Sequence, residues 1–314
     1  MFKRMFLFLS LNILIVASVS ILCDLIGLRP YISRAGLDLE SLAMFCLIWG
    51  MTGAFISLLL SKKIAKWMLN LKILHANQDL TVLEERVFVI VRNLSMKARL
   101  ISVPEVGIWQ SGQSNAFATG ASRNSSLIAV SSTLLETLTE SELEAVIAHE
   151  MAHITNGDMV TMALLQGVVN SFVMFLSRIC AYAVTHMASR DSKRGSSYFS
   201  YALFTMLFEM IFLSLASLLI FFVSRKREFA ADRGGAKLVG RDKMISALRA
   251  LEKNTTLSKK DFEKQKSLAA MMVCSSKKGG FSKLFATHPT IEERITYLES
   301  LSDYGWNVAR ETTF

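Results

Sequence analysis

Proline and cysteine are both scarce in this sequence. It contains three prolines and four cysteines among 314 residues. Long helices can therefore form without interruption, because proline kinks or ends a helix when it falls in the interior. No two cysteines form a C-x-x-C pair, so neither a thiolate zinc site nor a disulfide framework is indicated. A nucleic-acid recognition motif is also lacking, and we expect no nucleic-acid partner despite the formal net charge of +9.

Apolar residues, by contrast, are abundant. Hydrophobic side chains make up 52% of the chain and its mean hydropathy is +0.37, which is more typical of a membrane protein than of a soluble one. Four runs are long enough to cross a bilayer, for which about 20 residues are needed. The sequence thus predicts a mainly α integral membrane protein, surrounded by membrane lipids, with two hydrophobic helical hairpins and four candidate transmembrane helices. The four runs are residues 5–23, 41–61, 159–187 and 198–224.

The charges that flank these runs predict their orientation. A cleaved signal peptide would resemble the first run, but its apolar core is normally shorter, so we favour a retained anchor. Basic residues precede the first run and follow the second, and the positive-inside bias places the N-terminus and the chain from residue 62 onward in the cytoplasm. If both later runs span the bilayer, the basic loop around Lys193 lies outside and opposes this bias; otherwise the second hairpin is only partly inserted. The flanking basic residues are Lys3, Arg4, Lys62, Lys63, Lys66 and Lys72.

Two charged residues lie inside the later runs, where an unpaired charge is costly. Arg178 and Glu209 fall at similar distances from the middle of the loop that joins these runs. In a tight hairpin they would lie at similar depth and could form an ion pair. Alternatively, Arg178 reaches the membrane interface while Glu209 faces a polar cavity.

The stretch "HEMAH" carries the clearest chemical signal. It lies on a predicted helix whose start is marked by a capping box, Thr139 with Glu142 three residues later. Residues four apart lie about 40° from each other around a helix, so His149 and His153 can bind one tetrahedral Zn²⁺. Glu150 can then reach a metal-bound water. Without a metal the two histidines would be solvated side chains of an ordinary helix, but the apolar residues around them favour the metal site.

A catalytic zinc site needs a third protein ligand and a position left open for water. Metzincins supply a histidine six residues after the second histidine, but that position here is Met159, and the position of their glycine is Asn156. A carboxylate from another helix is the other common solution, and Glu228 in "SRKREFAADRGG" is the best candidate. Asp232, one turn later, could hydrogen-bond a ligand histidine. If it binds no metal, Glu228 is a surface residue of a charged segment beside the membrane.

Short candidate strands lie between an amphipathic helix at 81–99 and the histidine helix. They occupy 106–110, 115–119 and 126–130, separated by glycine- and serine-rich turns, and they predict a small β-sheet. We expect the chain to have four parts. These are an N-terminal transmembrane hairpin (1–61), the first part of a catalytic domain with the sheet and the histidine helix (62–157), the second hydrophobic hairpin (158–224), and the second part of the catalytic domain with the third ligand (225–314).

The stretches "HEMAHITNGD", "EFAADRGGA" and "HPTIEERI", together with the two hairpins, closely resemble the HtpX family of bacterial inner-membrane zinc metalloproteases. That family is more distantly related to the CAAX prenyl-protein endoproteases. The resemblance implies a gluzincin-type zinc peptidase domain that faces the cytoplasm from the inner membrane. It implies one Zn²⁺ per chain, held by His149, His153 and Glu228, with Glu150 as the catalytic base. It further implies an endopeptidase that clears misfolded or damaged membrane proteins under stress, with unfolded or membrane proteins as its substrates.

Two further groups could act in such a site. A tetrahedral oxyanion needs a donor besides zinc, and His288 is the first candidate, with Arg294 the weaker one. His288 could instead simply begin a helix before the proline that follows it. The resemblance makes Asn115, Ala116 and Phe117 part of an edge strand that would bind substrate through main-chain hydrogen bonds. The alternative is that they form an ordinary hairpin strand.

Two other functions are compatible with parts of the sequence. A CAAX-type processing protease would need a closed chamber of many membrane helices, and four apolar segments are too few to build one. A non-catalytic membrane scaffold with a structural metal would usually have all four metal positions closed by cysteine or histidine. Such a scaffold has no need of Glu150, so hydrolysis of peptide bonds is the favoured function.

Overall fold

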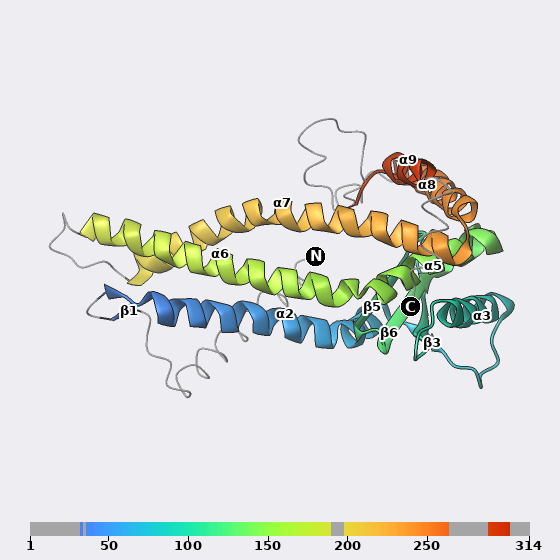
Figure 1. The fold of residues 1–314 in the computed structure, drawn as a ribbon, viewed down its shortest axis with the longest axis horizontal. Helices are drawn as coiled ribbons and strands as arrows, with labels where there is room; N and C mark the ends of the chain where they lie inside the picture. Colours follow the sequence, from blue (N-terminus) through green and yellow to red (C-terminus); the bar gives the residue numbers. More distant parts are fainter. Residues whose placement is uncertain (1–31, 34–35, 190–197, 264–287, 302–314) are drawn as a thin grey trace. The chain divides into compact units, whose positions relative to one another are not determined.

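The computed structural model describes residues 32–33, 36–189, 198–263 and 288–301 (Figure 1). The predicted first apolar run, 5–23, lies outside the described residues, as does the basic loop around Lys193. The chain divides into two compact units. The first consists of Met1–Ser57 with Ala163–Ile220, and the second of Leu58–Met162 with Phe221–Phe314.

Three long apolar helices stand out in the described chain: α2 (Leu39–Leu69), α6 (Asp158–Ser189) and α7 (Tyr198–Val239). Among the residues that the structure describes, these three are long and apolar enough to cross a bilayer. Three of the four candidate transmembrane helices are thereby confirmed. Helix α7 continues well past residue 224, the predicted end of its apolar run, so this run and Glu228 belong to one unbroken helix (Figure 1).

Glycine lets α2 and α6 approach each other closely within the first unit. A Cβ atom on Gly50 would lie 2.9 Å from the carbonyl oxygen of Gly167, and one on Gly167 would lie 3.3 Å from Cα of Met51. Small residues at such crossings allow the backbones of membrane helices to pack together. A short antiparallel pair, β1 (Ile32–Ser33) with β2 (Gly36–Leu37), precedes α2.

Arg178 of α6 and Glu209 of α7 form an ion pair in the first unit. Nη1 of Arg178 donates a hydrogen bond of 2.9 Å to Oε1 of Glu209 and another of 3.1 Å to the main-chain oxygen of Met174. The guanidinium also lies 5.5 Å from the centre of the Phe45 ring on α2. Arg178 therefore contacts α2 as well as α7, and the predicted pairing of the two charges is confirmed.

The second unit contains a four-stranded sheet in the order β3-β4-β6-β5. Strands β4 and β6 are parallel, and the other two neighbouring pairs are antiparallel. The three predicted strands are confirmed, with β5 at one edge of the sheet; β3 is only three residues long, too short to show an alternating pattern in the sequence. The strands are β3 (Lys72–Leu74), β4 (Glu105–Trp109), β5 (Ala116–Ser122) and β6 (Ser125–Ser131).

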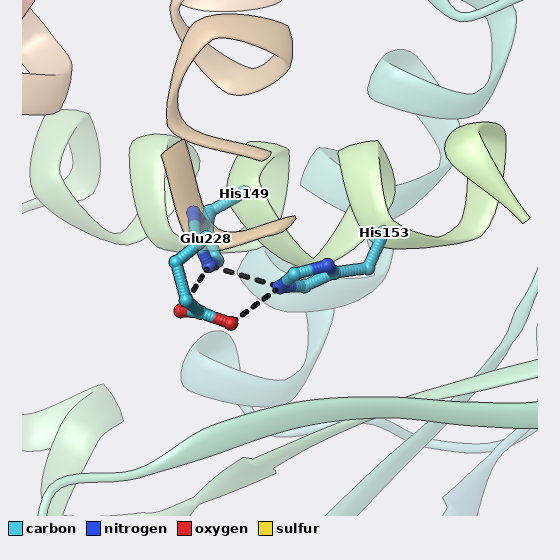
Figure 2. A group of neighbouring side chains, drawn as sticks. All are labelled: His149, His153 and Glu228. Atoms are coloured by element: carbon cyan, nitrogen blue, oxygen red, sulfur yellow. Dashed lines mark hydrogen bonds and ion pairs between the residues drawn. The ribbon is translucent and has the colours of Figure 1, made fainter. Parts of the chain in front are cut away.

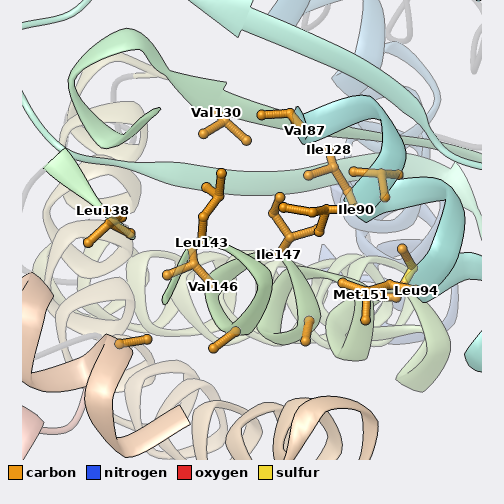
Figure 3. Packing of buried hydrophobic residues seen from close by; sticks show 14 of the residues in the cluster. Val87, Ile90, Leu94, Ile128, Val130, Leu138, Leu143, Val146, Ile147 and Met151 are labelled. Atoms are coloured by element: carbon orange, nitrogen blue, oxygen red, sulfur yellow. The ribbon is translucent and has the colours of Figure 1, made fainter. Parts of the chain in front are cut away.

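One face of this sheet packs with two helices to form the core of the second unit (Figure 3). Alternate residues of a strand point to the same face, and Ile128 of β6 points into the core. It belongs to one buried cluster with Ile90 of α3 (Val82–Lys97) and Ile147 of α5 (Glu140–Asn156). The amphipathic helix predicted at 81–99 is thus confirmed as α3. The remaining described helices are α4 (Ser132–Thr137), α8 (Arg241–Glu263) and α9 (Ile291–Ser300).

Both ends of α5 are fixed by local chemistry. The predicted capping box is present: Oγ1 of Thr139 accepts a hydrogen bond from the Glu142 N–H, and the Glu142 carboxylate accepts one from the Thr139 N–H. At the other end Gly157 has a φ of 72°, a left-handed conformation that favours glycine, and its N–H bonds to the last turn of the helix. These two caps fix where α5 begins and ends. Its apolar face packs on the sheet, so the residues on the opposite face point away from the sheet.

Arg178 and Glu209 should contribute to stability mainly through their interaction with each other, so the effects of replacing them should not be additive. We expect Arg178→Met or Glu209→Gln alone to lower the melting temperature in detergent by roughly 2–6 °C, because each removes one partner of an ion pair within an apolar segment. The double variant Arg178→Met/Glu209→Gln should regain most of that loss. Thermal unfolding followed by intrinsic fluorescence measures this, and strictly additive losses in the double variant would contradict the coupling.

Candidate metal centre

Two buried imidazoles from α5 face each other. His149 and His153 are four residues apart, so they lie on one face of the helix, and both are less than 10% exposed. Their ring centres are 4.7 Å apart and their Nε2 atoms are 3.1 Å apart. Two positively charged rings would repel each other at this distance, and the two Nε2 atoms face each other (Figure 2).

A carboxylate from α7 completes the group. Oε2 of Glu228 lies 3.6 Å from Nε2 of His149, and Oε1 lies 3.6 Å from Nε2 of His153 (Figure 2). Zinc bound tetrahedrally at about 2.0–2.2 Å holds its ligand atoms about 3.3–3.6 Å apart. The two Nε2 atoms are slightly closer than this, at 3.1 Å, and each lies 3.6 Å from a different oxygen of the Glu228 carboxylate. One ligand atom from each of the three residues lies within 4.8 Å of the others, so the group could hold one metal ion, and imidazole nitrogen and carboxylate oxygen are ligand types that zinc accepts.

The outer nitrogen of His149 is held by Asp232, one turn after Glu228 on α7. Nδ1 of His149 donates a hydrogen bond of 2.9 Å to Oδ1 of Asp232, which leaves Nε2 free to bind a metal. Asp232 is fully buried and accepts two hydrogen bonds from Arg294 of α9, at 2.5 and 2.7 Å. The structure therefore places Arg294 behind the His149 ring, on the side away from Glu228, and engaged with a carboxylate.

The field around His149 is strongly negative. Burial disfavours a charged imidazole, but the hydrogen bonds to Asp232 and Glu228 outweigh it and raise the pKa of His149 to about 9. A position that favours a proton to this degree also favours a metal cation, since both are stabilised by the same carboxylates.

His153 is held in the same way by a residue that the sequence analysis missed. Its Nδ1 donates a hydrogen bond of 2.6 Å to Oδ2 of Asp158, the first residue of α6. Gly157 makes this contact possible, because its left-handed conformation turns the chain directly from α5 into α6. Arg227 lies 3.8 Å from Asp158 and 3.7 Å from Glu228, and so partly balances both charges. A carboxylate placed directly after the glycine that ends the motif helix was the signal for this contact.

The approach of α7 to α5 depends on small side chains. A Cβ atom on Gly235 would lie 3.0 Å from the main-chain nitrogen of His149, and one on Gly234 would lie 2.8 Å from Cβ of Ala152. Real Cβ atoms almost never approach to 2.8 Å, and 3.0 Å is closer than most of them come, so a larger residue at either position would require α5 or α7 to shift. The "RGGA" segment of α7 thus allows Glu228 and Asp232 to reach the histidines.

The structure brings one of the other candidate residues, His288, to this centre. Glu150 is half-buried on α5 between the two histidines. His288 is exposed, but its Nδ1 lies 3.0 Å from Oε2 of Glu228, so the structure brings it to the ligand group. Asn115 directly precedes β5, the edge strand, which packs against α5.

The register of β5 shows which of its main-chain groups are available. The main-chain oxygen of Asn115 accepts a hydrogen bond of 2.9 Å from the Ser131 N–H, so its polar groups point toward β6. Main-chain groups alternate in direction along an antiparallel strand. The N–H and C=O groups of Ala116 and Ala118 therefore point to the outer edge, whereas those of Phe117 point to β6.

Comparison with known proteins places this membrane chain with the peptidases. Residues 78–302 match the family model described as "Peptidase family M48", and the chain belongs to this family. It is 44% identical over 304 residues to a protein named "Protease HtpX homolog" from Bacillus pumilus, covering 95% of this chain and 99% of that one. It is 45% identical over 300 residues to one from Albidiferax ferrireducens and 43% identical over 296 residues to "Protease HtpX" from Hahella chejuensis. The predicted relationship to the HtpX proteases is thus confirmed.

A solved structure shows the same fold at low sequence identity. The crystal structure of S. mikatae Ste24p superimposes with a TM-score of 0.57 at 18% identity, covering 82% of this chain and 58% of that one. At this identity the likeness concerns the fold alone. It agrees with the predicted fold class, a mainly helical membrane protein with a small sheet.

Asp158 offers a direct test of how His153 is held. We expect Asp158→Asn to weaken zinc binding by about 10-fold or more. The neutral amide would hold the imidazole less firmly and would raise the basicity of its Nε2 less than the carboxylate does. Competition with a chromophoric chelator, using the detergent-purified full chain, measures the affinity. Glu140→Gln is the matched control, since Glu140 is an exposed acid at the first residue of α5 and contacts neither histidine. Equal affinities in both variants would exclude this role for Asp158.

Proposed function

We propose that this protein is a zinc-dependent endopeptidase of the gluzincin type, anchored in the bacterial inner membrane. The observation that carries the proposal is the buried group of His149, His153 and Glu228, whose ligand atoms lie within 4.8 Å of one another, with Glu150 next to His149 in the sequence of the same helix. Membership of a peptidase family supports the reaction class. One ion per chain suffices, because this is the one such group of three ligand residues in the described part of the chain.

The residues divide the chemistry among them. A zinc ion at this centre would supply Lewis acidity, which polarises a scissile carbonyl and lowers the pKa of water toward 7. Glu150 takes the proton from the attacking water and delivers it to the leaving amine. Asp232 and Asp158 hold the protons on the Nδ1 atoms of His149 and His153, so that both rings keep their Nε2 atoms toward the centre.

Two further elements would bind the substrate. His288 is a candidate donor to the oxyanion that forms as water attacks, since it is a neighbour of Glu228 at the exposed side of the centre. The free edge of β5 is suited to bind an extended peptide as an added strand. Of the predicted residues Asn115, Ala116 and Phe117, Ala116 has its main-chain groups directed outward, and we propose that Ala118 pairs with the peptide in the same way.

Glu150→Gln tests the reaction. We expect this variant to lose at least about 100-fold in its rate of casein hydrolysis, because the amide cannot accept the proton from water. It should retain one zinc ion per chain, since Glu150 is not a ligand in the proposed site. Glu140→Gln, on the same helix, should cleave casein at the wild-type rate. A Glu150→Gln variant with wild-type activity would overturn the peptidase mechanism; loss of zinc from that variant would make Glu150 a ligand instead.

The same proposal includes a substrate class. The apolar run on α7 ends at Ser224, and Glu228 lies four residues later, a distance of about 6 Å along the helix. His153 lies six residues before Met159, where the apolar run of α6 begins. We propose that the centre acts near the cytoplasmic membrane surface on misfolded or damaged membrane proteins, as part of a stress response.

The orientation can be measured in cells. With the chain from residue 62 onward in the cytoplasm and the second hairpin fully inserted, residue 193 lies on the outer side of the membrane. A Lys193→Cys variant, in a background without the native cysteines, should then react with a membrane-impermeant maleimide in intact cells. Glu140→Cys, in the part of the chain proposed to lie in the cytoplasm, should react with the same maleimide only after the cells are lysed. Protection of residue 193 in intact cells would mean that the second hairpin does not cross the bilayer.

A further inference from the structure

A short loop after α3 exposes two large apolar side chains. Helix α3 ends at Lys97, and Arg99 then adopts a φ of 53° while the Leu100 N–H bonds to the Ser95 oxygen at 3.0 Å. This turn packs Leu100 against the core and directs the next residues outward. Ile101 is 90% exposed and Val103 is 51% exposed, although isoleucine and valine are among the residues most often buried.

One end of this loop is tied to the end of an apolar run. Glu105 forms ion pairs of 2.8 Å with Lys62 and 2.6 Å with Lys66, both on α2. Lys62 directly follows the apolar run that ends at Ser61, and lysines at this position mark the boundary between membrane and water. Exposed Trp67 lies on the same end of the helix, as is common for interfacial tryptophan. Glu105, four residues after Ile101, is therefore held at the level where α2 leaves the membrane.

The other side of the loop lies beside Met159 and Val160, where the apolar run of α6 begins. Ile101 shares a largely apolar surface depression of about 380 Å³ with Met159 and Val160. These two residues open the apolar run of α6. Arg123, exposed in the turn between β5 and β6, lines the same depression. The turn is fastened to the loop, because Oγ of Ser102 donates a hydrogen bond of 3.0 Å to the main-chain oxygen of Asn124.

All these contacts lie within the second unit, and they place the loop between two points at which the chain enters the membrane. We propose that residues 99–103 dip into the bilayer interface and bind an anionic phospholipid. Ile101 and Val103 would lie among the upper acyl chains, and the depression beside Met159 would hold part of one chain. Arg99 and Arg123, both exposed, would contact the phosphate of the headgroup. The pair of arginines beside the apolar residues favours an anionic lipid over an apolar segment of a substrate.

A probe placed at residue 101 tests this directly. All four native cysteines are replaced in the full chain, and Ile101→Cys is labelled with an environment-sensitive NBD group. The protein is then reconstituted into phosphatidylcholine vesicles with phosphatidylglycerol. We expect blue-shifted NBD emission and loss of fluorescence when the lipids carry a nitroxide on the upper part of the acyl chain. Replacing phosphatidylglycerol by phosphatidylcholine should reduce the quenching, because the arginines then lose the anionic headgroup.

Val82→Cys is the matched control, because Val82 is 82% exposed on the same unit but lies in the first turn of α3, at the opposite end of that helix from the loop. It should give emission typical of water and no quenching by the lipids. Val103→Cys provides a second probe should the first variant fold poorly.

Water-like emission at both 101 and 103 in vesicles would overturn the proposal. An apolar signal that arises only when unfolded casein is added would also overturn it, since the surface would then bind substrate. None of these readouts requires zinc or proteolysis, so they are independent of the proposed function.

Discussion

The close contact between α5 and α7 is the constraint on which the metal centre depends. Glu228 and Asp232 come from a helix far from the histidines in sequence, and they reach His149 because Gly234 and Gly235 leave room for the α5 backbone. The three buried carboxylates of the centre would each be costly without a partner. Here each one has an imidazole or a guanidinium beside it, so the helices and the charges hold one another in place.

The centre has a nearly symmetrical support. Each histidine directs Nε2 toward the other ligand residues and donates a hydrogen bond from Nδ1 to an aspartate of another helix, Asp232 of α7 or Asp158 of α6. Rings whose orientation is already fixed by a hydrogen bond at Nδ1 lose little freedom when a metal binds at Nε2, which favours affinity. The same two helices carry the apolar runs of the second hairpin, so the anchor and the support of the metal ligands are made from the same pieces of chain.

The residues that were predictable from sequence are those with a short-range pattern. The pair His149 and His153 follows from helical spacing, and Asp232 follows from Glu228 by one further turn. The three longer strands follow from short stretches separated by glycine- and serine-rich turns. Other features depend on how the chain folds back on itself: Asp158 is recognisable only once Gly157 is known to turn the chain, and β3 gains its strand conformation from pairing with β4. Arg294, the weaker candidate for an oxyanion donor, hydrogen-bonds Asp232, which is 62 residues away in sequence, and no short-range pattern indicates this contact.

The unbroken course of α7 has a geometric consequence for the length of its juxtamembrane segment. Each residue of an α-helix adds a rotation of 100° and a rise of 1.5 Å. One residue added between the apolar run and Glu228 would therefore turn the carboxylate away from the histidines, or else rotate the whole lipid-facing surface by the same angle. Seven added residues would nearly restore the direction but would lift the centre by about 10 Å. The number of residues from Ser224 to Glu228 thus fixes the angle around α7 between its lipid-facing side and the side that carries the metal ligand.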